Sequence, residues 1–104
     1  MASPADPLNL RGVQMPKFLI ERQVPGVGQL SASELQAVCR KSVGVLRQLG
    51  PDIQWMESYV VDDKLYCLYL APDQEMVREH ARLAGVPCNS ISEIKRIIDP
   101  ATAE

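Results

Sequence analysis

The hydrophobic pattern predicts an alternating series of strands and helices. Residues 17–22 form a short, mostly apolar segment followed by the turn-forming run 25–28, so they predict a strand. In the next segment, apolar or small side chains recur at helical spacing, at Leu35, Val38, Cys39, Ser42, Leu46 and Leu49. Ser31 and Glu34 have the spacing of a capping box at the start of this helix, and Gly50 ends it.

The middle of the chain predicts a hairpin. Residues 53–61 and 64–71 are β-rich runs, and the two aspartates between them form a two-residue turn that pairs Tyr59 with Tyr66. Alternation then divides the side chains between two faces. One face carries Trp55, Glu57, Tyr59, Tyr66, Leu68 and Leu70, and the other carries Met56, Ser58, Val60, Leu65, Cys67 and Tyr69. Because both faces are substantially apolar, we expect one to pack on the helices and the other on a second subunit.

The last third of the chain completes a known order of elements. Pro72 opens a second helical segment, which ends at Gly85, and residues 91–98 predict a final strand. The inward stripe of this helix is Met76, Val77, His80, Ala81 and Ala84. The order β-α-β-β-α-β predicts an α+β, ferredoxin-like βαββαβ fold, with a four-stranded antiparallel sheet and two helices on one face.

Length and composition agree with one small domain. The chain has 104 residues, of which 46% are hydrophobic, and we assign residues 16–104 to a single ferredoxin-like domain. Residues 1–15 are poor in apolar side chains and predict a disordered N-terminal extension that does not resemble a signal peptide. A net charge of −2 argues against a nucleic-acid partner. The apolar stretches are much shorter than the roughly 20 residues of a membrane span, so no membrane partner is expected.

The three cysteines indicate a reducing compartment. Cys39, Cys67 and Cys88 are an odd number, widely spaced, and no C-x-x-C motif is present. This argues against a zinc ribbon or a redox dithiol and favours reduced thiols in the cytoplasm. Each thiol is expected to be a small buried hydrophobe rather than a nucleophile.

Three residues are candidates for metal binding or acid–base chemistry. His80 is the single histidine, and its imidazole could bind a transition metal, act as an acid or base, or simply pack against the backbone. Glu21 and Glu57 lie in strands among apolar neighbours, where a carboxylate needs a cation, a metal or a hydrogen-bond donor. A salt bridge would satisfy that need as well as a metal would.

Three aromatic residues are candidates for a ligand pocket. In the predicted register Tyr59 and Tyr66 are cross-strand partners on the face that also carries Trp55. They could line a cavity for a small ligand, although cross-strand aromatic pairs also serve for packing alone.

Several segments together resemble one bacterial family. They are PKFLIER at 16–22, QWxxSYV at 54–60, DDKxYC at 62–67, REHAR at 78–82 and IDP at 98–100. In order and spacing they are similar to the actinobacterial nickel-binding, nickel-responsive proteins, which belong to a widespread bacterial domain family of unknown function. The resemblance implies a ferredoxin-like fold, a homodimer and Ni²⁺ binding. On the matching positions it implies metal ligands at His80, Glu21, Glu57 and Cys67.

Three hypotheses for function follow. The first is a cytoplasmic homodimer that binds Ni²⁺ or a similar divalent metal as a carrier or sensor. The second is a small-ligand-binding dimer or enzyme, with a cavity lined by tyrosines and carboxylates; it depends on analogy between folds. The third is a regulatory binding module that has neither metal nor catalysis.

Overall fold

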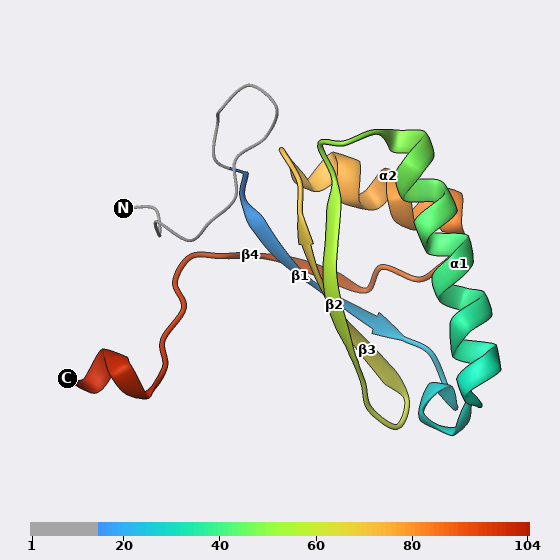
Figure 1. Cartoon of the computed structure of the whole chain (residues 1–104), viewed down its shortest axis with the longest axis horizontal. Helices are drawn as coiled ribbons and strands as arrows, with labels where there is room; N and C mark the ends of the chain where they lie inside the picture. Colours follow the sequence, from blue (N-terminus) through green and yellow to red (C-terminus); the bar gives the residue numbers. More distant parts are fainter. Residues whose placement is uncertain (1–14) are drawn as a thin grey trace.

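The computed structural model describes residues 15–104, which form one sheet and two long helices (Figure 1). The strands are β1 (Lys17–Gln23), β2 (Gln54–Val60), β3 (Lys64–Leu70) and β4 (Ser90–Ile94). The helices are α1 (Ala32–Leu49) and α2 (Gln74–Ala84), and two short 3₁₀ segments are η1 (Val27–Gln29) and η2 (Pro100–Ala103). No helix within residues 15–104 is both long and apolar enough to cross a membrane.

The sheet has the ferredoxin-like arrangement. Its strand order is β2-β3-β1-β4, and every neighbouring pair is antiparallel. Both α-helices lie on the same side of the sheet (Figure 1), which confirms the predicted βαββαβ fold. The side of the sheet that faces away from the helices is called the open face below.

Alternation along β1 decides which side chains enter the core. Phe18, Ile20 and Arg22 are buried toward the helices, whereas Leu19 and Glu21 between them are only half-buried and lie on the open face. The core continues with residues of β3 and α2, namely Cys67, Tyr69 and Val77. The first two inward positions of β1 are thus apolar, and the third is occupied by the guanidinium of Arg22.

Local signals at the helix ends and the hairpin are confirmed. The Ser31 hydroxyl accepts from the Glu34 amide at 3.2 Å, and the Glu34 carboxylate accepts from the Ser31 amide at 3.0 Å. Gly85 ends α2 in the left-handed conformation, with φ of 69°. Tyr59 pairs with Tyr66 in the β2–β3 hairpin as the two-residue turn predicts.

A β-bulge changes the predicted side of Trp55. Glu57 pairs with Leu68, but the next paired residue on β2 is Trp55, opposite Tyr69, so Met56 is the extra residue. Trp55 consequently lies on the helix side of the sheet. The prediction that it shares a face with Glu57 and the tyrosines is wrong, because strict alternation does not account for an inserted residue.

Two predicted boundaries also need correction. The last strand ends at Ile94 rather than at residue 98, because Ile94 pairs with Lys17, the residue at which its partner strand β1 begins. The second helix begins at Gln74 rather than at Pro72, since the Asp73 side chain caps it by accepting from the Met76 amide at 2.9 Å. The predicted extension at 1–15 lies outside the described residues except for Met15, which is buried.

Two glycines in different surroundings test this packing. A Cβ at Gly28 would lie 2.7 Å from the Val61 carbonyl oxygen and 2.9 Å from the Asp62 Cα, whereas a Cβ at Gly44 in α1 would meet no atom within 4 Å. Gly28→Ala should therefore destabilise the protein by about 1–3 kcal/mol through overpacking. Gly44→Ala should stabilise it by about 1 kcal/mol through helix propensity. Urea denaturation of both variants measures the two changes, and equal effects would contradict the close contact at Gly28.

Candidate functional site

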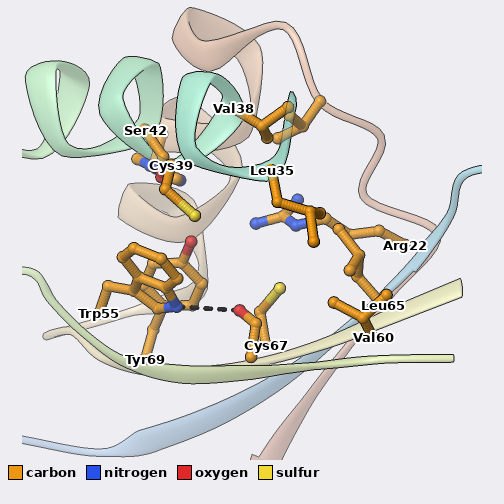
Figure 2. A pocket seen from close by; sticks show the side chains of 13 residues that line it. Arg22, Leu35, Val38, Cys39, Ser42, Trp55, Val60, Leu65, Cys67 and Tyr69 are labelled. Atoms are coloured by element: carbon orange, nitrogen blue, oxygen red, sulfur yellow. Dashed lines mark hydrogen bonds between the residues drawn. The ribbon is translucent and has the colours of Figure 1, made fainter. Parts of the chain in front are cut away.

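A pocket of about 190 Å³ lies between α1 and the helix side of the sheet (Figure 2). Much of its wall is apolar, formed by Leu35, Val38, Trp55, Val60, Leu65 and Val86. Its polar and thiol-bearing residues are Arg22, Cys39, Ser42, Ser58, Cys67, Tyr69 and His80. The pocket thus combines an apolar wall with a few polar groups, which is the usual composition of a small-molecule site.

Each element contributes to the pocket through its own geometry. The alternation of β1 and β3 directs Arg22 and Tyr69 toward the helices. The bulge at Met56 brings Trp55 to the same side, where its indole Nε1 donates to the Ser58 hydroxyl at 2.9 Å. The inward stripe of α2 supplies His80.

His80 is enclosed and neutral. Its side chain is almost completely buried, its Nε2 lies 3.0 Å from the Ser42 hydroxyl, and its Nδ1 has no hydrogen-bond partner among the described residues. The ring lies 5.2 Å from that of Tyr69. Burial, and secondarily the charge of Arg22, lower the pKa of His80. The imidazole therefore stays unprotonated at neutral pH.

Arg22 is a buried cation that pairs with no carboxylate of residues 15–104. Its side chain is 2% exposed, and Nη1 donates to the Pro87 carbonyl at 2.6 Å, but Nη2 has no partner among residues 15–104. Its guanidinium carbon lies 5.9 Å from the centroid of the Tyr69 ring. Burial raises the pKa of Tyr69 despite the nearby guanidinium, so the phenol is neutral and cannot balance the charge.

The open face carries a different set of polar groups. The Glu21 carboxylate accepts from Lys64 Nζ at 2.7 Å, and this hydrogen bond is the main reason why the pKa of Glu21 is lowered. Glu57 lies near Tyr59 and raises the pKa of that phenol. Tyr59 and Tyr66, which pair across β2 and β3, are part of this face and do not line the pocket.

The sheet divides the residues that the sequence singled out. His80 and Cys67 line the pocket, whereas Glu21 and Glu57 lie on the open face. Over residues 15–104, no three His, Cys, Asp or Glu side chains come together in a group that could hold a metal ion. Trp55 is likewise separated from Tyr59 and Tyr66. The four metal candidates of one chain cannot therefore surround the same ion.

Sequence reasoning missed Arg22, Ser42 and Tyr69 as site residues. A usable signal existed for Arg22, because it continues the alternation of Phe18 and Ile20 and thus falls on the core side of its strand. Ser42 lies in the apolar stripe of its helix and Tyr69 on the core side of its strand, but neither position predicts a shared polar pocket.

Comparisons with known proteins give a family and a fold. The family described as nickel-responsive protein SCO4226-like matches residues 18–94. The crystal structure of SCO4226 from Streptomyces coelicolor A3(2) is similar with a TM-score of 0.67 and 16% sequence identity, over 79% of this chain and 99% of that one. At this identity the likeness shows the fold alone. No curated protein matches the chain.

The neutral state of His80 makes stability depend on pH. Unfolding exposes the imidazole, which then takes up a proton below its ordinary pKa of 6.5, whereas the folded state resists protonation. The stabilising contribution should be fully present above that pH. It should decrease as the pH falls toward the lowered folded-state pKa, by at most about 1.4 kcal/mol per pH unit.

His80→Gln removes this titration and should flatten the profile. Urea denaturation of parent and variant between about pH 7.5 and about pH 5 measures the difference. Carboxylates titrate alike in both proteins and serve as the internal control. The same slope in both would contradict a neutral, buried His80.

Proposed function

Since this chain belongs to the family of SCO4226-like nickel-responsive proteins, we propose that it binds Ni²⁺ as a homodimer and acts as a carrier or sensor. The three cysteines are free thiols, which supports a cytoplasmic location. The observation on which the proposal rests is the placement of Glu21 and Glu57, both on the open face.

The pocket does not suit a cation. Arg22 brings a buried positive charge to it, and the Nε2 of His80 already interacts with Ser42. A metal bound there would have to be desolvated beside a guanidinium, at a high electrostatic cost. The proposal therefore leaves His80 and Cys67 to the pocket and places nickel on the other side of the sheet.

On the open face, one chain supplies too few ligands and two chains would supply enough. Glu21 and Glu57 lie on β1 and β2, which are separated by β3, so each would need ligands from a second copy. Half-buried apolar residues between them, including Leu19, Tyr66 and Leu68, provide the surface that a second copy would cover. The Lys64–Glu21 pair is partly exposed to solvent and therefore contributes little, so a divalent cation can displace Lys64 from Glu21.

Nickel affinity should depend on the open-face carboxylates. Ni²⁺ binds a given set of N, O or S ligands more tightly than Mn²⁺, Fe²⁺ or Co²⁺. Glu57→Gln should weaken Ni²⁺ binding at least tenfold, about 1.4 kcal/mol, in a calorimetric titration of tag-free protein at neutral pH. Glu75→Gln on the exposed surface of α2 is the matched control and should bind as the parent does. Unchanged binding by Glu57→Gln, with loss in His80→Ala, would move the metal into the pocket and contradict the proposal.

Dimer formation should use the open face. Leu68→Glu places a charge in the middle of that face, so it should shift the protein to monomer because the charge would be buried unpaired in the dimer. Leu83→Glu makes the same change at an exposed position of α2 and should leave association unchanged. Sedimentation equilibrium with and without Ni²⁺ measures both. A parent that stays monomeric at high micromolar concentration in both conditions argues decisively against the homodimer.

A further inference from the structure

The buried guanidinium of Arg22 has no anionic partner within residues 15–104. A guanidinium remains charged in proteins, and a buried charge without a counterion is costly. Within the described part of the chain, one of its terminal nitrogens, Nη1, donates to the Pro87 carbonyl. The other, Nη2, has no acceptor among these same residues. An acceptor from outside the chain would supply the missing interaction.

We propose that the pocket binds a small organic monocarboxylate, whose carboxylate accepts from Arg22 and whose apolar body lies against the walls of α1 and the sheet. Figure 2 shows the Arg22 side chain extending toward the pocket beside Leu35. The planar fork of a guanidinium matches the two oxygens of a carboxylate. This site is on the opposite side of the sheet from the proposed nickel site and does not depend on it.

The charges around the pocket favour a single negative charge on the ligand. Arg22 is the one cationic side chain among the residues that line the pocket, and none of these residues is Asp or Glu. His80 and Tyr69 are both neutral at physiological pH, as argued above. A doubly charged phosphate would be left with excess negative charge in an apolar enclosure, whereas a monocarboxylate is balanced.

The walls favour an apolar body of limited size. Trp55, Leu65 and Val86 give flat and branched apolar surfaces next to the polar groups. A cavity of about 150 Å³ is known to accept benzene in another protein, and the present pocket measures about 190 Å³. An aromatic or branched acid of about ten non-hydrogen atoms is therefore the fitting class.

A ligand can reach the pocket from solvent. Val38 of α1 and Val60 of β2 both line the pocket, yet each is 44% exposed. β2 is the edge strand of the sheet, so the opening lies between this edge and α1. Neither side chain is held by a polar contact, and small rotamer changes would widen the entrance.

The test uses three probes and two built-in reporters. The probes are benzoate, its neutral isostere benzamide and inorganic phosphate. The single tryptophan, Trp55, and the single histidine, His80, both line the pocket. Tryptophan fluorescence and the NMR signals of the imidazole ring therefore report on this site without any substitution.

Benzoate should perturb both reporters in the parent protein and bind at least about tenfold more tightly than benzamide or phosphate. Arg22→Met should lose this preference and bind benzoate no more tightly than benzamide. Arg40→Met removes the same charge from the exposed surface of α1 and should keep the preference. If Arg22→Met does not fold, the preference of the parent protein for benzoate over benzamide and phosphate still tests the proposal.

Three results would overturn the proposal. Equal affinity for benzoate and benzamide would show that the negative charge of the ligand does not contribute to binding. Phosphate binding as tight as that of benzoate would show that the apolar body does not contribute. No perturbation of Trp55 and His80 by any probe up to about 10 mM would show that the pocket takes no such ligand. Each of these three results can occur whether or not the open face binds nickel. The monocarboxylate proposal and the nickel proposal can therefore be contradicted independently of each other.

Discussion

Strand alternation in β1 places Arg22 in the core, where its charge acts on the neighbouring groups of the pocket. Phe18 and Ile20 fix the inward face of the strand by their burial, and Arg22 must follow them because β1 continues regularly to Gln23. The Pro87 carbonyl, just after α2, takes one of its hydrogen bonds. The same charge helps to keep His80 neutral, so the properties of the two groups cannot be understood separately.

The sheet separates two kinds of chemistry that the sequence places side by side. Glu21 and Arg22 are consecutive, as are Tyr66 and Cys67, but in each pair one residue lies on the open face and the other lines the pocket. The open face has carboxylates that suit cations, and the pocket has a cation that suits an anion. A single site using both sets would need side chains to pass through a hydrogen-bonded sheet.

Local signals made the fold predictable, while the site required tertiary contacts. The capping box at Ser31 and the two-residue hairpin turn involve only neighbours in sequence, and both occur as expected. The boundary of β4 was not predictable from its own residues, because Ile94 pairs with Lys17, where β1 begins near the other end of the chain. The pocket depends on a serine of α1 meeting a histidine of α2, 38 positions apart. The sequence periodicity of a single helix or strand cannot predict such a contact between two elements.

The bulge at Met56 shows how a single residue decides the composition of the site. Without it, alternation from Glu57 would turn Trp55 to the open face, and the indole could not donate to Ser58 on the helix side. The pocket would then lose the apolar wall that the indole provides. Bulges are common at sheet edges, and β2 is an edge strand, so the distortion occurs where the ladder can tolerate it. The aromatic wall and the buried cation thus each come from a departure from the regular alternation of a strand. In β2 the departure is an extra residue, and in β1 it is a charged residue at a core position.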